Sequence, residues 1–392
     1  MDEVHANKGG DLLVRTVAYF GHDVSDAAVR RRILALEQDG LGVIGFTKRR
    51  SGLAETSWDN VDLGKTKDGA FLQRIVSVFS GAYRTRRAGA KLKSTDIIIA
   101  RNLDMLACAL LGNWMTGARL PVVYECLDVH RLTCRDDVIG SVLRRLESWM
   151  MSKTKGLIVS SPAFLTEHFE KHYGPQERVR LVENRIVEGM VERPDYDLDA
   201  LLNKTRPDRL RLGWVGILRC NRSLDTLCQL AEMYRDDLTI ELHGIPARTE
   251  VPDFENRIAH HPNIYFHGRY KSPEDLEKIY GGLDLVWSID FMEAGLNSVW
   301  LLPNRIYEGG LFSVPSIALK GTQTDKWLSS KGVGFAVDEP LLESVSQLVG
   351  GLIKERDPIA EKQAAFSLLE DDVFIQPAGF IKDVVKDLLS RR

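Results

Sequence analysis

The chain has 392 residues, of which 44% are hydrophobic and 27% charged, and its formal net charge is −3. A chain of this length exceeds the size at which one hydrophobic core stops growing, so we expect two domains. The composition excludes a disordered or fibrous chain, and the slightly acidic balance predicts no nucleic-acid partner.

Cysteine usage and hydropathy bear on the compartment. The five cysteines are scattered and form no C-x-x-C pair, which argues against a zinc site or a disulfide framework and fits a reducing environment. The first residues lack the apolar core of a signal peptide, and the longest apolar runs are far too short to span a membrane. We therefore expect a soluble, cytoplasmic protein.

Short apolar runs alternate with helical patterns through the first half of the chain. Such a series is typical of an α/β fold with a parallel, doubly wound sheet. The predicted strands cover residues 15–20, 41–46, 96–100, 122–126, 156–160 and 178–182. Helices are expected at 25–38 and 68–92 and between the later strands.

A second series of the same kind starts at residue 209. Its predicted strands are 210–215, 238–242, 264–266, 285–288, 315–318 and 334–337, and its helices lie near 223–234, 273–281, 303–311 and 323–331. Residues 186–208 are polar, contain two prolines and lack clear periodicity, so we interpret them as a linker. We thus expect a Rossmann-like domain at 1–185, the linker, a second Rossmann-like domain at 209–372, and a C-terminal helix within 373–392 that packs back on the first domain.

The segment 302–310 carries the strongest functional signal. Its sequence, LPNRIYEGG, predicts a helix that starts near Pro303, where a missing backbone donor is tolerated. Arg305 and Glu308 are three residues apart and therefore share one helical face. Arg305 and the helix N-terminus at Asn304 suit a diphosphate, and Glu308 suits the hydroxyls of a ribose. An exposed i,i+3 ion pair explains the same spacing equally well.

A second candidate anion site follows the first strand of the second series. Gly216 allows close backbone approach, and Arg219 and Arg222 place cations beside the N-terminus of the next helix. A surface loop with two solvated arginines is the alternative, but the position at the carboxyl end of a strand favours the site. Asn297 lies in a loop expected at the same edge as Arg305, where it could contact a sugar.

Two candidates in the first series stand at strand ends. His22 could contact a sugar hydroxyl or transfer a proton, although a loop histidine without a function is equally consistent. Asp128 could form a carboxylate–imidazole pair with His130 near a reacting hydroxyl, or the pair could be structural. Asn102 follows another strand, and a helix cap explains it without any function.

A run of basic residues suggests a charged face on the first domain. Residues 83–94 contain five basic side chains and no acidic one, and Arg49 and Arg50 add to them. Such a face could meet anionic lipid head groups or a lipid-linked phosphate. A solvated charge run is the simpler alternative.

The stretch from Asn297 to Ile317, NSVWLLPNRIYEGGLFSVPSI, resembles the pattern N-x-x-x-x-L-P-N-K-L-F-E-x-x-A-x-G-x-P-V-I. That pattern is found in GT-B glycosyltransferases of family four, the group 1 transferases of bacterial polysaccharide synthesis. The resemblance covers nearly the whole chain. The LPNRIYEGG form is similar to transferases of exopolysaccharide clusters such as those of succinoglycan-type synthesis. Many relatives carry an earlier glutamate at a position that Trp300 occupies here.

The resemblance implies a GT-B fold, with two doubly wound Rossmann-like domains facing across a cleft. It implies a hexosyltransferase that takes a UDP- or GDP-linked sugar and a lipid-linked oligosaccharide at the inner membrane face. Glu308 would bind the donor ribose and Arg219 the diphosphate, while Asp128 would be the base if configuration is inverted. No cofactor and no metal are expected, because Arg219 and Arg305 can neutralise the leaving diphosphate.

Two other functions remain open. A nucleotide-sugar epimerase of the same fold would need acidic groups poised to take a proton from the sugar. A non-catalytic scaffold of a polysaccharide-assembly complex would fit Trp300 in place of the glutamate. A nicotinamide-dependent dehydrogenase is disfavoured, because no G-x-G-x-x-G follows the first strand of either half.

Overall fold

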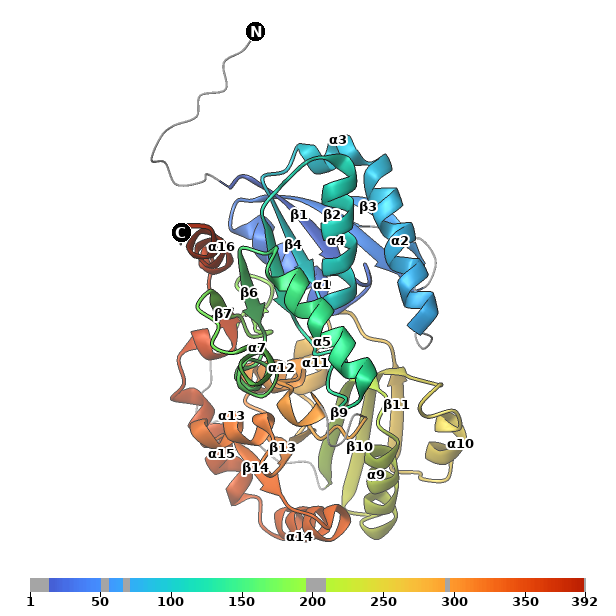
Figure 1. Ribbon diagram of the computed structural model, residues 1–392. Coiled ribbons are helices and arrows are strands. Elements are labelled where there is room, and N and C mark those ends of the chain that lie inside the picture. Colours follow the sequence, from blue (N-terminus) through green and yellow to red (C-terminus); the bar gives the residue numbers. More distant parts are fainter. Residues whose placement is uncertain (1–13, 51–55, 66–70, 195–208, 293–296, 391–392) are drawn as a thin grey trace. The chain divides into compact units, whose positions relative to one another are not determined.

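The computed structural model describes residues 14–50, 56–65, 71–194, 209–292 and 297–390 (Figure 1). The chain folds into two compact units. One consists of residues up to 183 together with 377–392, and the other consists of residues 184–376. Within the described ranges, every helix is too short or too polar to cross a membrane.

The first unit is built on a parallel sheet of seven strands in the order β3-β2-β1-β4-β5-β6-β7. The central strands β1, β4 and β5 are almost wholly buried, which explains their apolar sequences. The strands are β1 (Thr16–Gly21), β2 (Gly42–Arg49), β3 (Asp59–Lys65), β4 (Ile97–Arg101), β5 (Val122–Cys126), β6 (Gly156–Val159) and β7 (Val179–Leu181). The predicted parallel α/β architecture is confirmed for this half of the chain.

Helices connect these strands, and α2, α4 and α5 are neighbours (Figure 1). Side-chain caps fix the start of two helices, because Asp26 accepts from the N–H groups of Ala28 and Val29 and Asp137 accepts from that of Gly140. The helices are α1 (Ala27–Gln38), α2 (Phe71–Arg87), α3 (Gly89–Lys93), α4 (Leu103–Thr116), α5 (Val138–Met151), α6 (Pro162–Phe164), η1 (Leu165–Glu170) and α7 (Lys171–Tyr173).

The C-terminal helix α16 (Phe380–Ser390) also belongs to the first unit. The backbone N–H groups of Gly379 and Lys382 donate to the carboxylate of Asp39 at 2.6 and 2.9 Å. Leu388 lies so close to Gly156 of β6 that a Cβ there would approach its Cδ2 to 2.6 Å. A glycine at this position therefore lets α16 pack closely on the sheet.

The second unit contains a six-stranded parallel sheet in the order β11-β10-β9-β12-β13-β14. Its strands are β9 (Leu210–Leu218), β10 (Leu238–Pro246), β11 (Ile264–Gly268), β12 (Leu285–Trp287), β13 (Ser316–Leu319) and β14 (Gly334–Val337). The segment Ile186–Val187, which we assigned to a linker, forms strand β8 and pairs with β15 (Ile375–Gln376). The rest of that predicted linker lies mostly at 195–208, outside the described residues.

Helices pack against the second sheet in two separate hydrophobic cores. One core involves α9 (Asn221–Met233) and α14 (Leu341–Lys354), and the other involves α11 (Leu276–Tyr280), α12 (Asn304–Leu311) and α13 (Gln323–Lys331). The remaining elements are α10 (Phe254–Ala259), η2 (Asn297–Trp300), α15 (Asp357–Ser367) and η3 (Asp371–Val373). The predicted helix at 323–331 is confirmed in full as α13.

Candidate functional site

The carboxyl end of β9 allows a close backbone approach. Gly216 and Gly244 are paired across β9 and β10, and both have positive φ angles, of 121° and 140°. A Cβ on Gly244 would lie 1.7 Å from the carbonyl oxygen of Gly216, so only glycine fits there. A Cβ on Gly216 would lie 3.9 Å from Nη1 of Arg305. The loop predicted from Gly216 and the helix carrying Arg305 are thus brought together.

The loop after β9 is fixed to the end of β12. The buried Cys220 caps α9, and its sulfur accepts from the N–H groups of Ser223 and Phe291 at 3.3 and 3.2 Å. The hydroxyl of Ser223 donates to the carbonyl of Ile289 at 3.1 Å. These contacts place Arg219 next to Asp290, with 3.1 Å between Nε and Oδ2.

Arg305 is buried beside the carboxyl end of β9. Its side chain is 8% exposed, and Nη1 donates to the carbonyl of Val215 at 3.1 Å. Its Nε has no hydrogen-bond partner among the described residues. Burial lowers the pKa of the Arg305 guanidinium, and the negative charge of Asp290 opposes that shift. We call Arg219, Asp290 and Arg305 the arginine cluster.

Glu308 lies one helical turn after Arg305 and is 2% exposed. The hydroxyl of Tyr280 donates to Oε2 of Glu308 at 2.8 Å. Burial and the charge of Glu308 raise the pKa of Tyr280 well above its ordinary value, so this hydroxyl stays a donor. The exposed ion pair that the spacing also allowed is therefore wrong, because both side chains are buried.

The other predicted donor-side residues have varied surroundings. Asn304 is the first residue of α12, after the N-cap Pro303, so the helix starts where we predicted. Asn297 starts η2 and is buried, and Trp300 ends the same element. Arg222 points to a different partner from Arg219, since its Nη2 lies 2.6 Å from Oε2 of Glu339 and its guanidinium lies 4.2 Å from the Phe291 ring centroid.

In the first unit, His22 and Asp26 lie together after β1. Nε2 of His22 is 3.7 Å from Oδ2 of Asp26, which also caps α1. Burial alone would raise the pKa of Asp26, but the nearby His22 and the charge of Arg101 hold it well below its ordinary value. His22 is thus oriented by a carboxylate, and its Nδ1 has no partner among the described residues.

The side chain of Asn102 fixes the loop that carries Asp128. The side-chain oxygen of Asn102 accepts from the N–H groups of Leu127 and Asp128 at 3.0 and 3.3 Å. Asn102 occupies the N-cap position of α4, as expected, but it has a φ of 66° and its side chain makes no cap hydrogen bond. His130 uses Nδ1 to accept from the backbone N–H of Leu132 at 3.2 Å. Burial and the charge of Arg74 lower the pKa of His130 to about 4.

A buried ionic network that sequence reasoning missed lies at the ends of the central strands. Glu125 accepts from Nε and Nη2 of Arg101, both at 3.0 Å, and from Nε of Arg32 at 2.7 Å. The hydroxyl of Tyr19 adds a bond of 3.0 Å. Burial alone would raise the pKa of Glu125, but Arg101 and Arg32 lower it to about 2. The partners come from separate elements, α1, β1, β4 and β5, so no local motif indicated the network.

Two parallel α/β sheets with charged and polar side chains at their strand ends define the class of fold. The fold is similar to that of Anabaena Alr3699/HepE in complex with UDP and glucose, with a TM-score of 0.68, 16% identity, and coverage of 97% of this chain and 100% of that one. WaaG, a glycosyltransferase involved in lipopolysaccharide biosynthesis, gives a TM-score of 0.65 and 13% identity, with coverage of 96% and 100%. The chain thus has the GT-B glycosyltransferase fold that the sequence predicted.

No protein-family model matches the chain. It is, however, 39% identical over 343 residues to the succinoglycan biosynthesis protein ExoL of Rhizobium meliloti (strain 1021). The aligned residues cover 86% of this chain and 84% of that protein. The chain belongs to the ExoL family. The resemblance to succinoglycan-type exopolysaccharide proteins that the segment 302–310 indicated is confirmed.

Proposed function

We propose that this chain transfers a hexose from a nucleotide-diphosphate sugar to a lipid-linked oligosaccharide in exopolysaccharide biosynthesis. The observation that carries the proposal is Arg305, a buried cation with an unpartnered Nε at the carboxyl end of β9. A buried charge is costly unless a ligand or partner compensates it. The similar proteins support a nucleotide-sugar donor and a role in exopolysaccharide biosynthesis, since HepE was solved with UDP-glucose and ExoL is a succinoglycan biosynthesis protein.

The donor would occupy the second unit. Negative charge grows on the diphosphate as the bond to the anomeric carbon breaks, and cations aimed at that charge lower the barrier. Arg305 and Arg219 would supply them, Gly216 would let the phosphates approach the backbone, and the N-terminus of α12 at Asn304 would add its dipole. Glu308, held by Tyr280, would accept hydrogen bonds from the ribose. Since these residues would compensate the charge, the transfer step would need no metal or other cofactor.

The acceptor would occupy the first unit. His22 is oriented by Asp26 and would contact a sugar hydroxyl or relay its proton. Asp128 is exposed on a loop that Asn102 fixes, and it would take the proton of the attacking hydroxyl if configuration is inverted. An epimerase is less well supported, because the cluster in the second unit is cationic rather than acidic.

The ribose assignment is tested by Glu308→Gln. The variant removes a charge that would accept hydrogen bonds from the ribose, so we expect nucleotide affinity to fall about 10- to 100-fold, matching about 1.5–3 kcal/mol for a charged hydrogen bond. Calorimetric titration with the nucleoside diphosphate measures this change. Glu232→Gln, on the exposed face of α9, serves as the matched control and should bind like the wild type. Equal affinity for both variants would exclude the assignment.

We further propose that the helices α2, α4 and α5 face an anionic membrane. Val76, Phe79 and Tyr83 of α2 are 67%, 61% and 54% exposed, and three arginines stand in the last turn of that helix. Trp114 of α4 and Trp149 of α5 are exposed as well. Exposed apolar and aromatic side chains beside basic ones are typical of surfaces that enter the interface of an anionic bilayer. Such a contact would bring the protein to a lipid-linked acceptor.

Vesicle binding tests this surface. We expect Phe79→Ser with Trp149→Ser to reduce binding to phosphatidylglycerol vesicles at least about tenfold, because burying one large apolar side chain contributes about 1.5–3 kcal/mol. Co-sedimentation at fixed ionic strength gives the bound fraction. Leu368→Ser removes an even more exposed side chain from the second unit and should change nothing. Wild-type binding that is equally strong to neutral vesicles, or absent, would contradict the proposal.

A further inference from the structure

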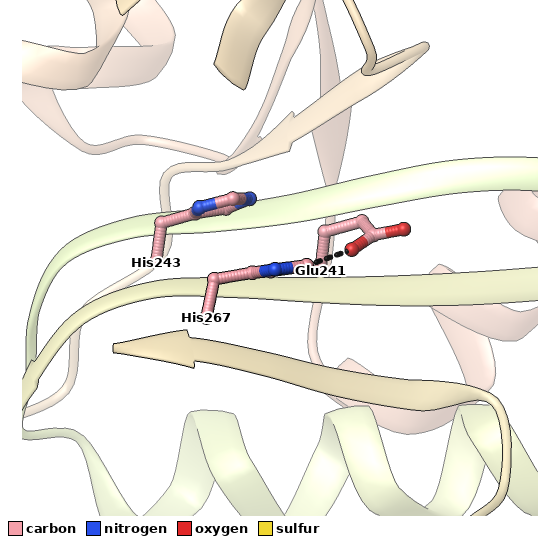
Figure 2. Close-up of side chains that lie close together, drawn as sticks. All are labelled: Glu241, His243 and His267. Carbon is pink, nitrogen blue, oxygen red and sulfur yellow. Dashed lines mark hydrogen bonds and ion pairs between the residues drawn. The ribbon is translucent and has the colours of Figure 1, made fainter. Parts of the chain in front are cut away.

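Two histidines and a glutamate, side chains of the types that ligate metals, gather on one face of the strands β10 and β11 (Figure 2). Alternate residues of a strand point to the same face, so Glu241 and His243 project together from β10. His267 comes from the neighbouring strand β11, next to the irregularity where the pairing shifts after Leu242. The three residues therefore meet by strand register and not by sequence proximity.

The side chains are close enough to share one ion. Nε2 of His267 lies 2.5 Å from Oε2 of Glu241. The imidazole rings of His243 and His267 stack with 4.3 Å between centroids and 9° between planes. One potential ligand atom from each residue lies within 4.8 Å of the others. Two imidazoles and a carboxylate suit zinc and similar divalent transition metals, whereas magnesium and calcium prefer oxygen ligands alone.

An exposed ion pair between His267 and Glu241 is the simpler interpretation, but it leaves His243 unexplained. Among the described residues, neither ring nitrogen of His243 has a hydrogen-bond partner. A neutral imidazole offers a lone pair to a metal ion from one ring nitrogen. Glu241 is largely shielded, at 18% side-chain exposure, while His267 at 47% leaves the cluster open to solvent.

We propose that Glu241, His243 and His267 form a binding site for one zinc-class divalent cation. Nearly parallel rings do not aim their nitrogens at one point, so binding requires at least one imidazole to rotate about its side-chain torsions. Three protein ligands leave a further coordination position for water. The cation would join the edge strand β11 to β10, directly before Gly244 and its partner Gly216. The proposal does not depend on sugar transfer.

Cobalt(II) provides the direct probe, because it occupies zinc sites and absorbs visible light when imidazole and carboxylate bind it. We expect the tag-free full chain to bind one equivalent of Co²⁺ with a saturable visible absorption, which Zn²⁺ abolishes and excess Mg²⁺ does not. His243→Ala and His267→Gln should each weaken binding about 100-fold or more, since outer-shell changes alone cost about 10–100-fold. His260→Gln, at the end of α10, is the matched control and should bind like the wild type.

The His267→Gln variant is decisive, because it changes a half-exposed side chain and leaves the core intact. Circular dichroism of each metal-free variant verifies its fold before titration, and Glu241→Gln, which keeps the side-chain volume, provides a second test at the carboxylate. The proposal is overturned if the wild type shows no saturable absorption. It is equally overturned if His267→Gln and Glu241→Gln bind with wild-type affinity, or if His260→Gln loses the site.

Discussion

Arg305→Met is expected to lower the rate of sugar transfer about 100- to 1,000-fold, the effect of removing one preorganised group that stabilises developing charge. Methionine keeps most of the length of the side chain but removes the cation that stands beside Asp290 and Arg219. Donor affinity should fall as well, because Arg305 would contact the diphosphate in the bound donor, and the turnover rate should fall further because the diphosphate gains charge as the bond breaks. Initial rates over a range of donor concentrations separate the turnover rate from donor affinity.

A matched control shows whether the effect is local. Arg356 is another largely buried arginine of the second unit, and its Nη1 lies 3.2 Å from Oδ2 of Asp284 at the amino end of β12. Arg356→Met should leave the turnover rate within about threefold of the wild type, because ligands bind at the carboxyl ends of such sheets. Arg305→Lys should recover part of the rate by restoring the charge. A fully active Arg305→Met variant would remove the proposed role of the arginine cluster.

Glu125→Gln is expected to destabilise the first unit by about 3–5 kcal/mol, because it leaves Arg32 and Arg101 buried without their counter-charge. The folded-state pKa of Glu125 is lowered from 4.5 to about 2. Its ionised form is therefore favoured by folding, and this contribution is complete above the unfolded pKa and declines as the pH falls towards the folded one. Urea denaturation of the wild type and the variant at neutral pH and near pH 3 measures both effects.

Tyr19→Phe is the control for this network. It removes one hydrogen bond to Glu125 and should cost only about 1 kcal/mol. The difference in unfolding free energy between Glu125→Gln and the wild type should also shrink at the lower pH. A Glu125→Gln variant that is as stable as the wild type at neutral pH would mean that the buried arginines are compensated by other groups.

The sequence predicted most central strands, because buried parallel strands are continuous apolar runs that local patterns reveal. It missed β3, whose Asp59, Asn60 and Asp62 give an edge strand a polar sequence. It also placed the last helix within residues 373–392, although β15 and Pro377 occupy the start of that range and precede α16. Edge strands and short pairings depend on distant partners, so their sequences carry little local signal.

The residues of the candidate site were likewise predicted where their spacing is local and missed where it is not. Arg305 and Glu308 were found because both stand in one short helix and their spacing is local. Glu125 and Arg101 were missed because they belong to different strands. The role of a charged residue inside an apolar strand cannot be predicted until the residue that pairs with it is known. His267 was missed for the same reason, since only the pairing of β10 with β11 brings it to Glu241.

The central claim is that the second unit binds a nucleotide-diphosphate sugar through the arginine cluster. Calorimetric titration of the purified chain with UDP-, GDP- and TDP-sugars, and with the corresponding nucleoside diphosphates, tests it most directly. We predict micromolar binding of one nucleotide class and its loss in Arg305→Ala, with Arg356→Met binding normally. Absence of binding to every nucleotide would contradict the transferase and favour a scaffold in polysaccharide assembly.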